Sequence, residues 1–159
     1  MPQINASYQK DMAIALPGMV ADTSRYNIDG ACVLNGSVNV PVGVAVQIDS
    51  VQAVDGHKVM KPMAASGKAY GVAIRSHFQT VGANGQMEYE AGGGMNVMTS
   101  GRVWVISKDT TAPAFGAAVK FDVDGKQKVD GAIETVWSYA GGFTKFGDIQ
   151  LVEIQLSQL

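Results

Sequence analysis

Short runs in which apolar and polar residues alternate recur along most of this chain, and glycine, proline or an Asp-Gly pair bounds each of them. Residues 42–48 place four β-branched side chains on one face, and residues 117–123 repeat the pattern. A period of two residues is typical of a strand with one buried face. About eight to ten such runs follow one another, and no amphipathic run of helical period and normal length occurs. The sequence therefore predicts an all-β, jelly-roll-like sandwich or barrel of about eight to ten short strands.

The stretch 95–106 carries two β-prone runs on either side of Ser100-Gly101. In the second run two valines share one face, while Arg102, Trp104 and Ile106 share the other. We expect the valine face to be buried. Two interpretations of Trp104 stay open: a core side chain, which is the more usual place for tryptophan in a β domain, or a contact with a partner.

The first part of the chain has a different composition. Pro17-Gly18 predicts a turn, and a polar run follows it over residues 21–30. We expect an extended N-terminal arm over residues 1–30 and a single β-sandwich or jelly-roll domain over residues 31–159. The larger apolar side chains of the arm are predicted to lie on another surface, either that of their own domain or that of a neighbouring molecule; they are Met12, Ile14, Leu16, Met19 and Tyr26.

Three local signals add detail to the strand pattern. Asn35-Gly36 between two apolar runs predicts a β-hairpin. Gly141-Gly142 is expected to end the strand that begins near Ala132. The apolar parity changes between Leu151 and Val152, and a β-bulge at that point would reconcile the two halves of the last strand.

Composition narrows the class of protein. The chain has 159 residues, which fits one domain with a real core. Only 16% of its residues are charged, against about 25% in typical domains, which favours a subunit of an assembly. The net charge of −2 gives no reason to expect nucleic-acid binding. No targeting segment is apparent, and no apolar run approaches the roughly 20 residues of a membrane span. The one cysteine, Cys32, lies in an apolar run and is expected to be a buried, inert thiol.

The templates for catalysis and metal binding all fail. His57 and His77 are the only histidines, and neither belongs to a cluster with metal-ligand spacing. The acidic turn 122–125 would put lysines where a calcium loop needs acids. The glycines of residues 92–94 lack the Lys-Ser/Thr of a phosphate loop and precede a strand. We therefore expect no catalytic residues, no cofactor, no metal and no enzymatic activity.

One alternative function rests on aromatic residues. Trp137, Tyr139 and Phe143 surround Gly141-Gly142. If they were exposed, they would form a stacking platform for sugars. With such a platform, the chain would be a carbohydrate- or receptor-binding jelly-roll module of a virion.

Segments along most of the chain resemble one protein family in the same order. The chain is similar to the structural cement, or head decoration, proteins of tailed bacteriophages from about residue 12 to its end. Val42 stands where a phenylalanine is expected, and residues 110–144 match only in general character. The matching segments are PGMVAD (17–22), VPVGVAV (40–46), YGVAIRS (70–76), MNVMTSGRVWV (95–105) and LVEI (151–154).

This resemblance implies a function in the virion. A member of the family would be made in the cytoplasm of the bacterial host, bind the major capsid protein on the outer surface of the capsid across capsomer junctions, and stabilise the expanded head. The resemblance also implies a homo-oligomer, with a symmetric dimer favoured over a trimer. The candidates for protein contacts are then the five arm residues together with Arg102 and Trp104.

Overall fold

The computed structural model describes residues 13–52, 56–76 and 79–157. Among these residues it contains eleven strands and no helix, so the all-β prediction is confirmed. The strands are β1 (Asn27–Leu34), β2 (Val40–Pro41), β3 (Ala45–Val51), β4 (Lys58–Pro62), β5 (Gly71–Ala73), β6 (Thr80–Val81), β7 (Met87–Tyr89), β8 (Gly94–Ile106), β9 (Ala118–Phe121), β10 (Ile133–Phe146) and β11 (Ile149–Leu156).

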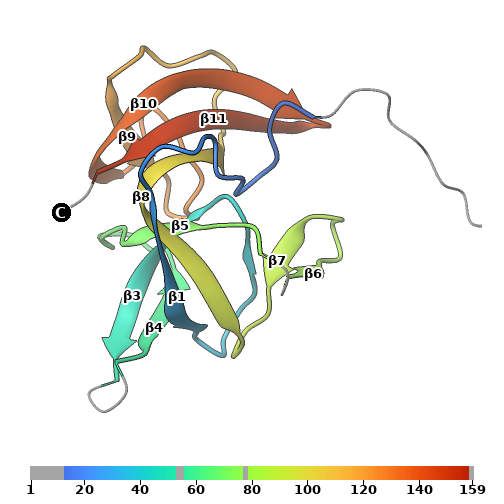
Figure 1. The fold of residues 1–159 in the computed structure, drawn as a ribbon, viewed down its shortest axis with the longest axis vertical. Helices are drawn as coiled ribbons and strands as arrows, with labels where there is room; N and C mark the ends of the chain where they lie inside the picture. The colour runs from blue at the N-terminus through green and yellow to red at the C-terminus, as the bar shows by residue number, and fades with distance from the viewer. Residues whose placement is uncertain (1–12, 53–55, 77–78, 158–159) are drawn as a thin grey trace, which may run out of the picture.

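Five of the strands close into a barrel. The order of the main sheet is β1-β4-β3-β5-β8-β11-β10-β9, and β1 also pairs with β8. That extra pairing closes β1, β4, β3, β5 and β8 on themselves, and β11, β10 and β9 extend the sheet beyond the barrel (Figure 1). The sequence predicted either a sandwich or a barrel, and the structure contains a barrel. Its β1–β4 pair is parallel, which departs from the fully antiparallel order of a jelly roll.

Strand β8 belongs to both parts of the molecule. Its first half pairs with β1 and β5 in the barrel, and its second half pairs with β11. Met95 and Val97 share one core cluster with Trp104 and Ile106, so the buried parity changes between the two halves. Gly101 makes this change possible because its φ of 105° is one that side chains rarely allow. Ser100-Gly101 therefore does not separate two strands but lets one strand exchange its faces.

Two core clusters explain the parity of the last strand. Leu151 faces one cluster, while Val152 and Ile154 face the other. The pairing of β11 with β8 is continuous from Leu151 to Leu156, so the bulge predicted at Leu151–Val152 is wrong. Both faces of the strand are buried, and a regular alternation therefore produces two apolar neighbours. The irregularity lies in the partner strand instead, between Tyr139 and Phe143 of β10.

Two further local predictions, a hairpin and a strand end, are also wrong. Residues 36–37 form a turn, but β1 pairs with β4 and β8, and β2 pairs with β7, so Asn35-Gly36 does not close a hairpin. Strand β10 does not end at Gly141-Gly142 but continues through these residues to Phe146. In the first case the pairing partners are distant in sequence, whereas β10 continues because it pairs with β11, the strand that follows it.

The described part of the arm lies along β8. The backbone N–H of Gly18 donates to Trp104 O, and that of Trp104 donates to Met19 O, each at 2.9 Å. The N–H of Ala21 donates to Arg102 O at 2.9 Å. Residues 18–21 thus act as one more antiparallel neighbour of the second half of β8. The predicted boundary at residue 30 falls within β1, which begins at Asn27.

Candidate functional site

The arm residues predicted to make contacts lie in different environments. Ile14 is 76% exposed and Tyr26 is 51% exposed. Leu16 lines a pocket, and Met19 packs against the core of its own domain. Met12 lies outside the described residues. The structure therefore leaves Ile14 and Tyr26 on the surface and places Met19 against the molecule itself.

Arg102 and Trp104 do not form a joint surface. Trp104 is only 7% exposed and belongs to a core cluster. The Nε of Arg102 donates to Gln155 Oε1 at 3.0 Å, and its guanidinium lies 3.6 Å from Asp22. Of the two interpretations of Trp104, the core position is the one in the structure. Arg102 connects the polar part of the arm to the sheet.

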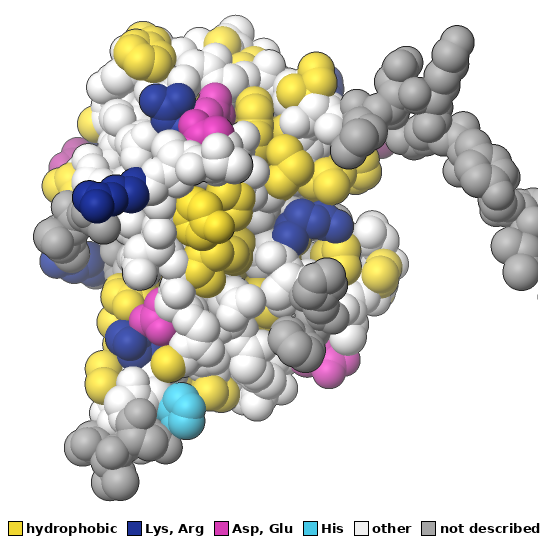
Figure 2. Space-filling view, in the orientation of Figure 1, with side chains coloured by type: hydrophobic (Ala, Val, Ile, Leu, Met, Phe, Trp, Pro, Cys, Tyr) yellow, Lys and Arg dark blue, Asp and Glu magenta, His cyan; other side chains and the backbone are white. Residues whose placement is uncertain are grey.

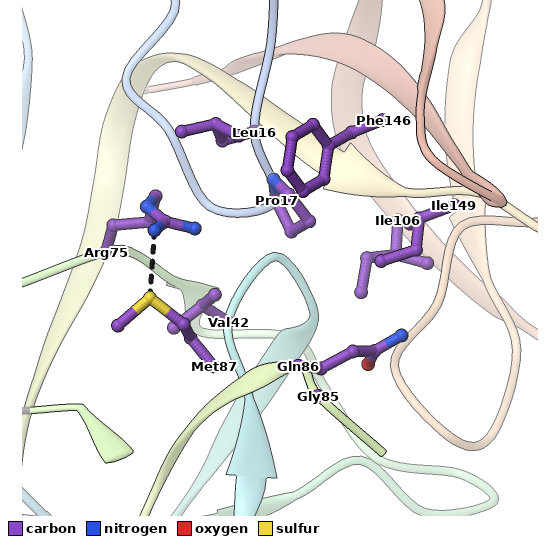
Figure 3. Close-up of a pocket in the computed structure, with 10 residues that line it drawn as sticks. All are labelled: Leu16, Pro17, Val42, Arg75, Gly85, Gln86, Met87, Ile106, Phe146 and Ile149. Atoms are coloured by element: carbon purple, nitrogen blue, oxygen red, sulfur yellow. Dashed lines mark hydrogen bonds between the residues drawn. The ribbon is translucent and has the colours of Figure 1, made fainter. Parts of the chain in front are cut away.

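A pocket of about 220 Å³ lies beside the start of the arm (Figure 3). We call it the groove. Its apolar wall combines the arm, the barrel and the β10–β11 turn. The side chains of Arg75 and Met87 lie together on one side of it, where an Arg75 nitrogen donates to Met87 Sδ at 2.8 Å. The lining residues are Leu16, Pro17, Val42, Arg75, Gly85, Gln86, Met87, Ile106, Phe146 and Ile149.

Further large apolar side chains are exposed at two places that the sequence pattern did not indicate. Phe115, in the loop before β9, is 78% exposed, and Val136 on β10 is also exposed. Val81 and Phe146 are exposed beside the groove, since Val81 pairs with the lining residue Met87. Figure 2 shows that hydrophobic side chains also gather near the middle of one face. In the sequence, Phe115 is a lone aromatic residue between Pro113 and Gly116, in a segment where no core strand was expected. Its isolation from any predicted strand is the feature that could have marked it as exposed.

A cluster of titratable groups joins three parts of the barrel. Asp29 on β1 lies 2.8 Å from Lys58 Nζ on β4 and accepts a hydrogen bond from the Tyr70 hydroxyl at 2.7 Å. Burial raises the pKa of this carboxyl, but the hydrogen bonds from Lys58, Tyr70 and the backbone of Ala31 outweigh it and hold the pKa below its ordinary value. Burial raises the pKa of the nearby Cys32 thiol to about 12. The cluster therefore stabilises the barrel and offers no reactive thiolate at neutral pH.

The described residues contain no group of three or more His, Cys, Asp or Glu placed to hold a metal ion. In the acidic turn at residues 122–125, the carboxylates pair with Lys108, whose Nζ lies 2.6 Å from Asp122 and 2.8 Å from Asp124. His77 lies outside the described residues.

Within the described ranges, no helix has the length and apolar character of a membrane span.

The predicted aromatic platform is wrong. Trp137 and Tyr139 are 5% and 3% exposed and belong to the second core cluster. The ring of Trp137 meets Phe121 edge to face, with centroids 5.6 Å apart. The Tyr139 hydroxyl accepts a hydrogen bond from the buried Gln127. These rings point inward because β10 covers the core with the face that carries its aromatic residues, so they are not available to stack on a sugar.

Comparison with known proteins identifies the family. The family model described as "Structural cement protein (E217 gp24/Pam3 gp6)" matches residues 4–157. Among solved structures, a chain of "The capsid of Myoviridae Phage XM1" is similar with a TM-score of 0.69 at 17% identity, and the match covers 98% of each chain. No curated protein matches this chain.

The likeness to the XM1 chain supports the fold, and the family match extends over nearly the whole chain. It includes the arm, the barrel and the added strands. A cement protein is a non-enzymatic structural component of the phage capsid. The chain belongs to the phage structural cement protein family.

Proposed function

We propose that this protein binds the outer surface of the major capsid protein lattice, across junctions between capsomers, and stabilises the expanded head. The observation that supports this proposal is the exposed apolar surface around Phe115 on a domain of the cement family. A phenylalanine side chain that stays in water forgoes a large hydrophobic gain. A partner that covers it would recover that gain.

The surface for this contact combines the loop before β9 with the outer face of β10. Phe115 lies close to Gly141, and Ala118 and Val136 are exposed on the neighbouring strands. These strands form one end of the molecule, and the end of β3 and the start of β4 lie at the other end (Figure 1). Tyr26 packs beside Gly101 and adds a second exposed aromatic on the flank.

Each contact needs only moderate affinity, because the capsid is a repeating lattice. If associated copies engage several sites at once, the later contacts form at high effective concentration and attachment becomes long-lived. A contact that spans two capsomers also resists their separation. Binding alone would then stabilise the shell.

Co-sedimentation with purified expanded and unexpanded capsids tests the proposal. We expect the full-length protein to bind expanded capsids and Phe115→Asp to weaken binding by about tenfold or more, as expected when a charge replaces an aromatic anchor. Val51→Asp is the matched control, because Val51 is also exposed but lies at the end of β3. If the wild-type protein bound neither capsid form, the proposal would be wrong. If Val51→Asp alone weakened binding, the assigned surface would be wrong.

A further inference from the structure

The groove has no role in the contact surface proposed above. It is bordered by the arm, the β6–β7 hairpin and the β10–β11 turn, away from Phe115. Figure 3 shows Pro17, Phe146, Ile106 and Ile149 around a common space, with Leu16 above Arg75. Val81 and Phe146 add exposed apolar surface at its margin, and Ile14, two residues before the lining residue Leu16, is also exposed. A surface of this kind is suited to an apolar segment of another chain.

Arg75 sets a second requirement for whatever binds there. Within the described residues, its guanidinium has only Met87 Sδ as a side-chain partner, and no carboxylate lies within ion-pair distance of it. A thioether is a weak acceptor, whereas a guanidinium carries five donors in a fork that matches a carboxylate. The groove therefore suits an apolar segment that also carries an acidic side chain.

The chain itself contains such a segment, shortly before the lining residue Leu16 in the sequence. Twelve residues precede Ala13, and they end in Lys10-Asp11-Met12 with Tyr8 shortly before. Asp11 supplies the carboxylate, and Tyr8 and Met12 supply bulky apolar side chains. Twelve extended residues span at most roughly 40 Å, which is enough to cross from one small domain to its neighbour.

Local sequence favours a second copy over the same chain as the source of this segment. Leu16 and Pro17 already form part of the wall of the groove. To enter its own groove, the chain would have to reverse direction just before Leu16. The chain bends at Ile14, but residues 12–16 contain no Gly, Pro, Asn, Asp or Ser, the residues that favour a tight reversal. The exposed side chain of Ile14 also lies outside the groove of its own chain.

We propose that the groove binds residues 8–12 of a second copy of this chain, with Tyr8 and Met12 against its apolar wall and Asp11 paired with Arg75. Two copies that exchange these segments around a two-fold axis would fill both grooves at once. The exchange would also cover Ile14 and Phe146 in each copy. This association is independent of capsid binding and takes place in solution.

Photo-crosslinking of the full-length protein tests the exchange. A benzophenone amino acid replaces Tyr8, the protein is mixed with an equal amount of ¹⁵N-labelled copies, and the products of irradiation are mapped by mass spectrometry. We expect crosslinks from position 8 to the segments around Met87 or Phe146 that join one labelled and one unlabelled chain. Crosslinks only within one chain, or only to other regions, would overturn the proposal.

Charge reversal tests the ion pair in the same preparation. We expect Arg75→Glu and Asp11→Arg each to raise the dimer dissociation constant, measured by sedimentation equilibrium, by about tenfold or more. The double variant should restore dimerisation, which a folding defect would not do. Arg25→Glu is the control, because Arg25 is exposed on the arm outside the groove. A monomeric wild-type protein, or single variants that leave the dimer unchanged, would contradict the pairing of Asp11 with Arg75.

Discussion

At the scale of single residues, close packing around Trp104 favours glycine at one position of β10. Gly142 lies over the indole ring, and a Cβ atom at this position would overlap both Trp104 and the side chain of Glu153. The N–H of Gly142 also donates to Glu153 Oε2 at 3.2 Å. The bulge in β10 thus brings bare backbone down onto a buried aromatic ring.

Gly142→Ala is expected to destabilise the protein by about 1–3 kcal/mol, the usual cost of overpacking a well-filled core. Denaturant unfolding followed by circular dichroism measures the change. Gly36→Ala is the control, because no atom lies within 4 Å of a Cβ built there, and its effect should stay within about 0.5 kcal/mol. Equal effects of the two substitutions would contradict this account of the packing.

Asp29 gives the stability a dependence on pH. Because hydrogen bonds hold its folded-state pKa below the ordinary value, its contribution is present above the unfolded pKa of about 3.9 and is lost as the pH falls through the folded pKa. Asp29→Asn should therefore lower the free energy of unfolding at pH 7 and flatten its decline below about pH 4.

Unfolding midpoints measured from pH 7 down to pH 3 check this prediction. Asp130→Asn is the control, since Asp130 lies 3.2 Å from Lys128 but is 77% exposed, and such surface pairs contribute little. If stability declined with falling pH at the same slope in wild type and in Asp29→Asn, the assigned role of Asp29 would be ruled out.

At the scale of elements, the arm between Gly18 and Ala21 is held as a strand by close backbone contact. Gly43 has a φ of 83°, and a Cβ built there would lie 2.8 Å from Gly18 N. The O atom of Gly18 also accepts a hydrogen bond from Arg75 N at 2.9 Å. The arm and the barrel thus meet where neither residue carries a side chain.

Gly43→Ala is expected to cost about 1–3 kcal/mol through backbone strain and overlap, and to loosen the arm. Trypsin cleavage after Arg25 should then become faster under native conditions. Gly85→Ala is the control, because its φ of 76° is similar but no atom lies within 4 Å of its Cβ position. Unchanged cleavage in Gly43→Ala would show that the arm does not depend on this contact.

Alternation in the sequence identified strands, but which strands pair and which cluster each face meets depend on tertiary contacts that the sequence does not show. The alternating residues before Asp49 and around Val119 were correctly assigned to strands, now β3 and β9. The change at Leu151 was misread because the sequence does not show which of two core clusters a side chain faces. Asn35-Gly36 was misread because a turn signal is local, whereas strand pairing depends on distant partners.

The candidate contact residues were only partly predictable. The arm residues were predicted to lie on another surface without a choice between their own domain and a neighbouring molecule; Ile14 and Tyr26 are exposed, Met19 packs on its own domain, and the burial of Trp104 was left open. Phe115 was missed because no periodicity marks a single exposed aromatic in a loop. The groove was missed because its walls come from the arm and from strands far apart in sequence, so only tertiary packing assembles it.

At the scale of the whole molecule, the barrel and the added strands differ in the edges that they offer. Five strands close on themselves and leave no free edge in the barrel, whereas β9 is the last strand of the part of the sheet that extends beyond it. Phe115 and Val136 are exposed at the β9–β10 end, and Val81 and Phe146 are exposed beside the groove. A low charge fraction of 16% suits a subunit whose surface is partly covered in an assembly.

A cryo-electron microscopy reconstruction of expanded heads incubated with the purified protein tests the central claim most directly. We expect density for the barrel on the outer surface, across the junctions between capsomers, with the β9–β10 end and Phe115 against the major capsid protein. Density inside the shell, density confined to the tail, or undecorated heads at saturating protein would contradict the proposed function.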